Sequence, residues 1–392
     1  MSVDKARHAV VLHYSEIGLK GKNRRLFEER LVKNLRLALR GLGHWRIERA
    51  YGRFVMHLPD PADWAPISAR LRKVVGLANF ALAETVPQTP EAIIEAACRQ
   101  MARRQFASFA VYTRRVQKEF PLTSMELSSE AGRRIQEQSG ARVDLDHADV
   151  TCFIEIFDRQ AIVYTEKIPG LRGLPIGTGE RALGLLSSGI DSPVACWKVM
   201  RRGVKMNFVH FHSMPYTSEA SLNNTRRLVE LLTPYQFTSK LYSVPFIEIQ
   251  QQVMATARPE YGVVLYRRSM IRIAEKIARK LRANALVTGE SIGQVASQTL
   301  SNIRAIADPA TLPILRPLVG SAKEEIIAVA REIGSYEIST EPYEDCCSLF
   351  IPKHPVTRAL PEIILDAEMK LDLEKLERQA LEAAQVEQFR FP

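Results

Sequence analysis

The 392-residue sequence lacks the features of a membrane protein or of a disulfide-stabilised one. Its longest nearly apolar run, Val74 to Ala83, is about half of the ~20 residues that a membrane-spanning helix needs. The N-terminus has no basic segment followed by an apolar stretch and a small-residue cleavage site, so nothing in it directs export. The cysteines number only five, and Cys346 and Cys347 are adjacent. We therefore expect a cytoplasmic protein with reduced thiols and no membrane segment.

The composition is that of an ordinary folded protein, with 46% hydrophobic and 25% charged residues and no long low-complexity tract. One hydrophobic core rarely serves a chain of this length, so we expect two or three domains. The formal charge of +10 is concentrated at the front, where residues 1–50 hold 12 Lys/Arg against 5 Asp/Glu. A surface that neutralises RNA phosphates explains this cluster, and so does a solvated helix face. Its candidate RNA-binding residues are Lys20, Lys22, Arg24 and Arg25.

Hydrophobic periodicity in the first 180 residues predicts two α+β units, in which short strands alternate with amphipathic helices. The first unit, residues 1–75, has predicted strands at 8–14 and within 45–58, and predicted helices at 26–39 and 67–75. The second, residues 76–166, has predicted helices at 90–104 and 128–139, and predicted strands at 106–114, 150–157 and 160–165. Glycine or proline occupies nearly every other position of 168–179, so we predict a linker over residues 167–180.

From Arg181 onward, the pattern changes to apolar strands alternating with helices, which is typical of a doubly wound parallel sheet. The predicted strands are 182–186, 205–211, 238–244 and 285–288, and the helices between them include 247–257 and 264–281. Ligand chemistry is then expected at the carboxyl ends of the strands. The tail from 361 to 388 has helical spacing, which favours a packing helix or a dimer helix.

A small-residue loop, Ser187-Ser-Gly-Ile-Asp-Ser-Pro193, joins the first of these strands to a helix. A strand, a loop and a helix N-terminus together present backbone N–H groups and the positive end of the helix dipole to an anion such as phosphate. Asp191 would repel that phosphate unless a cation lay between them, which makes it a candidate Mg²⁺ partner. A capped helix start without a ligand is the alternative.

This loop resembles the Ser-Gly-Gly-X-Asp-Ser signature of the PP-loop ATP pyrophosphatases, with Ser188 in place of the first glycine. Four more segments narrow the resemblance: His210 to Glu219, Tyr266 to Arg272, Val287 to Gln298 and Glu344 to Cys347. Together they resemble the tRNA 4-thiouridine synthetase family, ThiI. The resemblance implies an N-terminal ferredoxin-like domain (1–75), a THUMP RNA-binding domain (76–166), a linker (167–180) and a PP-loop domain (181–392).

The resemblance also implies a reaction. ATP and Mg²⁺ would adenylate the uridine at position 8 of tRNA on its O4, because AMP leaves far more readily than a carbonyl oxygen, and sulfur would then replace it. The chain resembles the short form without a rhodanese domain, so a persulfide donor such as a cysteine desulfurase or a separate rhodanese would supply the sulfur. The family also has a sulfur-relay role in thiamine thiazole synthesis. A homodimer is a further expected partner state.

The resemblance assigns roles to individual residues. Asp191, Lys323, Cys346 and Cys347 would be catalytic. The ATP-binding residues would be Leu185, Leu186, Ser187, Ser188, Gly189, Ser192, His210, Phe211, Arg267, Gly289 and Gln298.

The same residues have structural explanations. Strand-end packing explains His210 and Phe211, a surface helix charge explains Arg267, and a solvated lysine explains Lys323. A zinc site at the two adjacent cysteines is disfavoured, because the other three cysteines lack metal-ligand spacing. Both are then buried structural thiols, or one of them, Cys346 before Cys347, is a nucleophilic thiolate. Another PP-loop tRNA modifier, such as a lysidine-type ligase, and a non-enzymatic RNA-binding protein remain the alternative functions.

Overall fold

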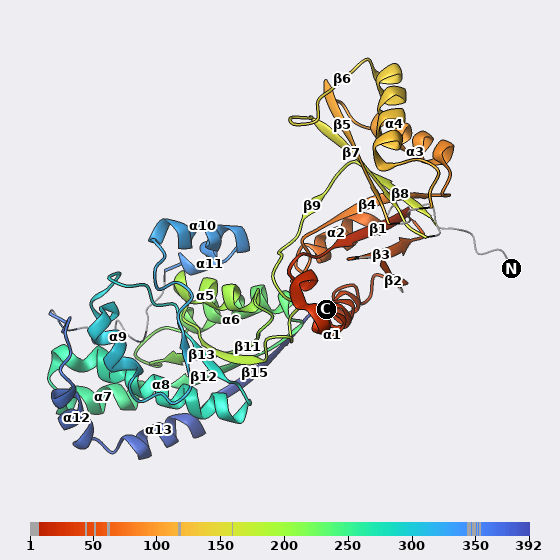
Figure 1. Ribbon diagram of the computed structural model, residues 1–392. Coiled ribbons are helices and arrows are strands. Elements are labelled where there is room, and N and C mark those ends of the chain that lie inside the picture. The colour runs from red at the N-terminus through yellow and green to blue at the C-terminus, as the bar shows by residue number, and fades with distance from the viewer. Residues whose placement is uncertain are drawn as a thin grey trace. The chain divides into compact units, whose positions relative to one another are not determined.

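The computed structural model describes residues 8–43, 45–50, 52–60, 63–116, 119–158, 160–342, 346, 350, 352 and 354–392. The chain divides into two compact units, residues 1–175 and 176–392 (Figure 1). Within the described ranges, every helix is too short or too polar to cross a membrane.

The first unit is built on a single nine-stranded sheet. Its strands are β1 (His8–His13), β2 (Ile47–Ala50), β3 (Arg53–Leu58), β4 (Asn79–Val86), β5 (Ser108–Arg115), β6 (Arg142–Val143), β7 (Val150–Ile156), β8 (Ala161–Tyr164) and β9 (Ile168–Pro169). The order is β2-β3-β1-β4-β8-β7-β5-β6, and β9 pairs with β4. Because β4 pairs with β1 on one side and with β8 on the other, the two predicted α+β units share this sheet. The predicted linker begins with β9, which lies along β4.

The helical segments described beside this sheet are η1 (Glu16–Asn23), α1 (Arg24–Ala38), α2 (Trp64–Leu71), α3 (Pro90–Ala102) and α4 (Ser124–Ser139). The predicted start of the last helix at residue 128 is one turn late, because a capping box begins it earlier. The Thr123 side chain accepts a hydrogen bond from the Glu126 amide, and the Glu126 carboxylate accepts one from the Thr123 amide. Gly140, in the left-handed conformation, ends α4.

The second unit has a six-stranded sheet in the order β14-β13-β10-β11-β12-β15. Its strands are β10 (Arg181–Leu185), β11 (Lys205–His212), β12 (Thr238–Pro245), β13 (Ala285–Val287), β14 (Ile314–Leu315) and β15 (Gln385–Arg390). The first five are parallel, as the sequence pattern predicts, and β15 is antiparallel to β12.

Helices cover both faces of this sheet, which confirms the doubly wound prediction. They are α5 (Asp191–Met200), α6 (Ala220–Leu232), α7 (Ile247–Thr256), α8 (Gly262–Lys280), α9 (Leu300–Ala307), α10 (Lys323–Ile333), α11 (Tyr336–Ser339), α12 (Pro361–Met369) and α13 (Leu373–Glu382), with short 3-10 turns at η3 (Thr233–Tyr235), η4 (Pro259–Tyr261) and η5 (Ala296–Gln298). Figure 1 shows α5, α6 and α10 on one face and α7, α8 and α13 on the other. The core between the sheet and α8 includes Val209, Val244, Leu286, Ile273 and Ile277.

The helical prediction for the C-terminal tail is right for α12 and α13 and wrong at its end. Residues Gln385–Arg390 form β15, which pairs with β12 from Thr238 to Ser243. This strand is mostly exposed and polar, so it lacks the apolar alternation by which a strand is recognised in a sequence. Pairing with the open edge of β12 therefore decides its conformation.

A buried ion-pair network fastens the C-terminal helices to α8. The Arg268 guanidinium donates two hydrogen bonds to the Glu368 carboxylate, at 2.8 and 2.9 Å. Arg272 donates to Glu368 and to Glu377, which is also paired with Lys276. Burial opposes ionisation of Glu368, but the two arginines outweigh it and hold the pKa of this carboxyl below its usual value.

We expect Glu368→Ala to lower the free energy of unfolding by about 3 kcal/mol, because it leaves the buried Arg268 without its bidentate partner. Urea denaturation followed by circular dichroism measures this change. Asp366→Ala, on the same helix, is the matched control. Asp366 forms an exposed pair with Lys370, so its loss should lower stability by less than about 1 kcal/mol. Equal losses in the two variants would contradict the structural role of the network.

Candidate active site

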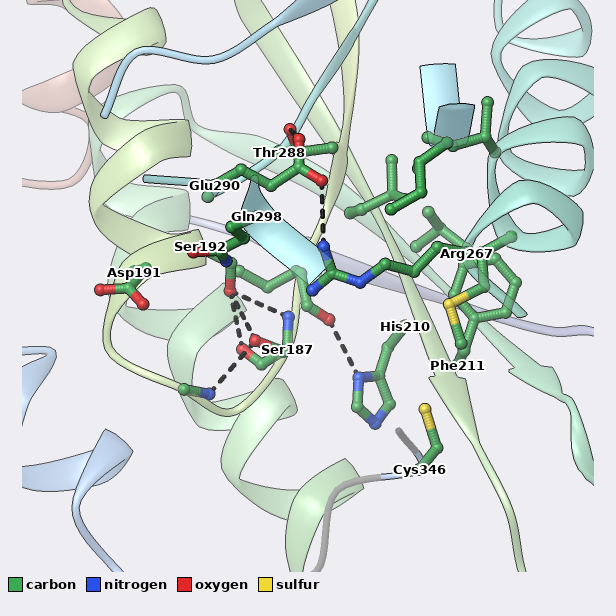
Figure 2. Close-up of a pocket in the computed structure, with 18 residues that line it drawn as sticks. Ser187, Asp191, Ser192, His210, Phe211, Arg267, Thr288, Glu290, Gln298 and Cys346 are labelled. Atoms are coloured by element: carbon green, nitrogen blue, oxygen red, sulfur yellow. Dashed lines mark hydrogen bonds and ion pairs between the residues drawn. The ribbon is translucent and has the colours of Figure 1, made fainter. Parts of the chain in front are cut away.

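A pocket of about 190 Å³ lies at the carboxyl ends of β10, β11 and β13. This edge is where strand order reverses in a doubly wound sheet and where ligands bind in such folds. Twelve of the residues predicted from the sequence line it (Figure 2). They are Leu185, Leu186, Ser187, Gly189, Asp191, Ser192, His210, Phe211, Arg267, Gly289, Gln298 and Cys346.

The loop between β10 and α5 is held by hydrogen bonds between its own ends. The Ser187 amide donates to the Ser192 hydroxyl at 2.9 Å, and that hydroxyl donates to the Ser187 carbonyl oxygen at 3.1 Å. Helix α5 begins at Asp191, and the apolar side chain of Ile190 before it cannot cap the first amides. Asp191 and Ser192, the first residues of the helix, line the pocket, so the N-terminus of α5 with the positive end of its dipole lies there and suits an anion.

Asp191 is paired with a lysine that sequence reasoning alone interprets as solvated. Its carboxylate accepts a hydrogen bond from Lys323 Nζ at 2.7 Å and one from Gln294 Nε2 at 3.0 Å. Lys323 is thus partly exposed and also forms an ion pair with Asp191. Helix α10 places this lysine at its first position, and the tertiary fold brings that position beside the loop.

His210 is a buried residue that also lines the pocket. Its Nδ1–H donates to the Leu186 carbonyl oxygen at 2.9 Å, and Nε2 lies 3.5 Å from the Ser221 hydroxyl. Phe211 lines the pocket too, and packs edge-on against Phe246 at a centroid distance of 5.4 Å. The expected ATP-binding role and the packing role are thus compatible at both positions. His210 supports the loop and Phe211 packs in the core, while both side chains line the cavity.

The chemistry of the lining fits a nucleotide. One side is apolar and can receive a base, and it comprises Leu185, Val209, Phe211, Met270, Ile271 and Ile306. Among the described side chains, Gln298 Oε1 is buried without a hydrogen-bond donor. An unsatisfied buried acceptor costs about 1–3 kcal/mol, and an exocyclic amino group such as that of adenine would satisfy it. The opposite side is the loop and the N-terminus of α5, where phosphates would lie.

Glu290 is a central residue of the pocket that the sequence analysis missed. Its carboxylate accepts hydrogen bonds from Arg267 at 3.0 Å, from Arg316 at 2.6 Å and from the Thr288 hydroxyl at 3.0 Å. Figure 2 shows Arg267 directed toward Glu290. The signal that could have found it is an acidic residue one position after Gly289, at the carboxyl end of a buried strand.

Ser188, predicted to contact ATP, points away from the pocket. It is fully buried, and its hydroxyl lies 3.0 Å from that of Ser221 on α6. Ser188 is not among the described non-glycine residues with positive φ, so this position does not require glycine for its backbone conformation. A serine here leaves the pocket side of the loop unobstructed.

Cys346 is buried and lines the pocket, with its carbonyl oxygen accepting a hydrogen bond from Gln250 Nε2 at 2.7 Å. Cys347, the other predicted catalytic cysteine, lies outside the described residues. The remaining cysteines, Cys98, Cys152 and Cys196, are buried structural thiols. Burial raises the pKa of Cys152 and of Cys196 to about 12, so both are protonated at neutral pH.

The four predicted RNA-binding cations lie in the first unit, around η1 and the start of α1. Lys22 and Arg25 are exposed, although Arg25 also pairs with Glu29. Lys20 lies over the ring of Phe27 at 5.2 Å. Arg24 donates to the Glu28 carboxylate at 2.8 Å and to the Tyr14 hydroxyl, so it stabilises the local fold.

The fold and the pocket together define a class of protein: a PP-loop nucleotide-binding domain that follows an α+β unit with basic character. Comparison with known families narrows the class. Residues 177–373 match the family described as "Thiamine biosynthesis protein (ThiI)", residues 9–81 match the ThiI ferredoxin-like domain and residues 88–166 match the THUMP domain. The chain belongs to the ThiI family.

Individual relatives agree with this assignment. A probable tRNA sulfurtransferase of Thermus thermophilus is 42% identical over 97% of this chain and 93% of its own length. One of Alkaliphilus oremlandii is also 42% identical, over 97% of this chain and 98% of its own. The crystal structure of a 4-thiouridine synthetase–RNA complex with bound ATP superposes with a TM-score of 0.90 and 36% identity, covering 98% of this chain and 100% of that one.

We expect Ser188→Gly to retain the fold and to release pyrophosphate from ATP at a rate within about twofold of the unmodified protein. The reason is that the variant removes a CH₂OH group directed away from the pocket, whose hydrogen bond to Ser221 is worth about 1 kcal/mol. A tRNA-dependent pyrophosphate-release assay measures the rate. Ser188→Ala removes the same hydroxyl without adding backbone freedom and is the control. A large loss of activity in both variants would mean that the hydroxyl has a direct function.

Proposed function

We propose that this protein is a tRNA sulfurtransferase that uses ATP to adenylate the uridine at position 8 of tRNA and then forms 4-thiouridine there. The observation that carries the proposal is the combination of an anion-binding loop and a base-sized apolar wall in one pocket of a ThiI-family chain. Relatives named tRNA sulfurtransferase and a superposable 4-thiouridine synthetase with RNA and ATP support it. Mass analysis of tRNA from cells with and without the protein tests it: absence of any difference in 4-thiouridine content would refute it.

ATP would lie along the pocket from the apolar wall to the loop. Its base would occupy the cavity beside Phe211, where Gln298 Oε1 can accept from the amino group. Its phosphates would face Ser187, Gly189 and Ser192 at the N-terminus of α5. Arg267 is within reach of the same cavity and offers a planar set of donors to phosphate oxygens. The tRNA uridine O4 would then attack the α-phosphorus, and pyrophosphate would leave.

Asp191 and Lys323 form the polar end of this site. The Lys323 ammonium neutralises Asp191 and would stabilise negative charge that develops on the phosphates. The single carboxylate of Asp191 fits a Mg²⁺ ion that is shared with the substrate, because Mg²⁺ is commonly held by one carboxylate and substrate phosphates. Among the described residues, no group of three or more acidic, histidine or cysteine side chains could hold a metal alone. When bound, Mg²⁺ would neutralise the pyrophosphate leaving group, and Asp191 would be its protein ligand.

Cys346 would carry the sulfur chemistry, with Cys347 as the alternative. Its thiolate would accept the terminal sulfur of a persulfide on a donor protein and release the donor's thiolate. The terminal sulfur of the new persulfide would then attack C4 of the adenylated uridine, and AMP would leave with the original oxygen. The uridine would then be joined to Cys346 by a disulfide. A second thiol, from another cysteine or an external thiol reductant, would attack the Cys346 sulfur, form a disulfide with it and release 4-thiouridine. The persulfide donor could be a cysteine desulfurase or a rhodanese. The same relay would serve thiamine thiazole synthesis, in keeping with the family's description.

The first unit would bind the tRNA through a ferredoxin-like domain over residues 1–75 and a THUMP domain over 76–166. A homodimer would be compatible with tRNA binding by the first unit and catalysis by the second. The half-buried Lys20 and the exposed Lys22 of η1 would contact phosphates, because the surrounding segment has a large excess of positive charge.

We expect Asp191→Asn to lower tRNA-dependent pyrophosphate release by about 100-fold or more, because it removes the charge that balances Lys323 and would bind the metal. Binding of tRNA should be unchanged, and a filter-binding assay checks this. Glu324→Gln is the matched control, because it also converts a carboxylate to an amide, at the exposed residue that follows Lys323 on α10. An Asp191→Asn variant with normal pyrophosphate release would exclude the proposed role.

We expect the double variant Lys20→Ala, Lys22→Ala to weaken tRNA binding and to reduce the salt dependence of binding. Each phosphate contact that is lost should lower the slope of log affinity against log salt by about 1. Titrations at several salt concentrations measure this slope. A double variant of exposed lysines in the second unit, Lys280→Ala, Lys370→Ala, removes the same charge as a control. Identical slopes for the two double variants would contradict RNA contact by the first pair.

A further inference from the structure

A buried glutamine links Cys346 to the residue that follows strand β11 at the pocket. Gln250, on α7, has no exposed surface. Its Nε2 donates to the carbonyl oxygen of Cys346 at 2.7 Å, and its Oε1 accepts a hydrogen bond from the Ser213 hydroxyl at 2.5 Å. Ser213 is itself fully buried and immediately follows β11, the strand that carries His210. Gln250 thus bridges Cys346 to the end of the strand that lines the pocket.

The chemistry of these groups determines how the amide is oriented. A backbone carbonyl only accepts hydrogen bonds, so the NH₂ end of Gln250 must face Cys346. The oxygen end then faces Ser213, whose hydroxyl must donate. Because all three residues are buried, losing a partner leaves an unsatisfied polar group that costs about 1–3 kcal/mol. Water cannot replace either hydrogen bond of this bridge, as it could at the surface, so both partners of Gln250 are needed.

Gln250 is not one of the residues that line the described pocket, whereas Cys346 is. The amide therefore holds the backbone of Cys346 from behind, and the thiol faces the cavity from the other side of the residue. An anchor of this kind affects where the sulfur lies and leaves the ATP contacts at Ser187, Asp191 and Arg267 untouched. Reactions between bound groups are sensitive to such placement, since a shift of about 1 Å can lower a rate about 100-fold.

We propose that Gln250, oriented by Ser213, is a positioning residue for the sulfur-transfer step: it fixes Cys346 at the pocket and has no part in adenylation. This inference depends on the proposed role of Cys346. It separates the two half-reactions structurally, because the phosphate side of the pocket is organised by β10, β13 and α10, and the thiol side by β11 and α7.

The test uses Gln250→Met in the full-length protein, because methionine keeps the volume of the side chain and removes both hydrogen bonds. Gln252→Met is the matched control, since Gln252 lies two positions along the same helix and is exposed. Cys346→Ser serves as the reference for loss of the thiol. Three quantities are measured: pyrophosphate release with tRNA, 4-thiouridine formation, and alkylation of Cys346 by iodoacetamide, located by peptide mass analysis.

We expect Gln250→Met to slow 4-thiouridine formation by about tenfold or more and to leave pyrophosphate release within about twofold of the unmodified protein. Alkylation of the buried Cys346 requires local opening, and losing the anchor should increase its rate about fivefold or more. Gln252→Met should match the unmodified protein in all three assays. Ser213→Ala removes one bond of the bridge and should change thiolation and alkylation in the same directions, by about threefold.

Thiolation and alkylation that are both unchanged in Gln250→Met would overturn the inference, as would a parallel loss of pyrophosphate release and thiolation. If Gln250→Met does not fold, Ser213→Ala decides by the same criteria. Two other results would refute the proposed function and not this inference. In the first, the unmodified protein forms no 4-thiouridine; in the second, Cys346→Ser forms 4-thiouridine at the normal rate. In either event, the alkylation rates of Gln250→Met and Gln252→Met still decide whether the amide positions Cys346, and equal rates would exclude it.

Discussion

The pocket of the second unit depends on a close backbone approach between two segments that are about a hundred residues apart in the sequence. A Cβ atom on Gly289 would lie 2.8 Å from the Ser192 nitrogen and 2.9 Å from the Asp191 carbonyl carbon, so only glycine allows the end of β13 to pack against the start of α5. This approach brings Thr288 and Glu290 to the side of the anion-binding loop. It therefore determines which side chains face the same cavity as the N-terminus of the helix.

Charge pairing in the pocket follows from this arrangement. A cavity suited to ATP needs cations, and closely spaced cations need counter-charges when no anion is bound. Glu290 supplies one negative charge between Arg267 and Arg316, and Asp191 supplies another to Lys323. The cations are thereby held in place in advance, which is the condition under which electrostatic groups act most strongly on a reaction. The proposed sulfur chemistry would depend on a separate contact, the hydrogen bond from Gln250 to the backbone of Cys346.

Much of this architecture is predictable from the sequence because it depends on short-range patterns. Alternating apolar strands and helices predict the parallel sheet, and the loop from Ser187 to Ser192 predicts an anion site at its edge. The polar strand β15 is not predictable in this way, because pairing with the edge of β12 decides it and its own side chains do not. The role of Lys323 is equally hidden, since an isolated lysine at a helix start is usually solvated.

The sequence by itself determined the kinds of secondary structure, the order of the units and the loop that can bind phosphate, because local propensity and periodicity encode these features. Only the tertiary structure decided that Ser188 faces Ser221 and not the cavity, that Glu290 lies between two arginines, and that a buried glutamine holds Cys346. The physical reason is that each of these contacts joins residues far apart in the chain. Their hydrogen bonds form only after packing has removed the competing water.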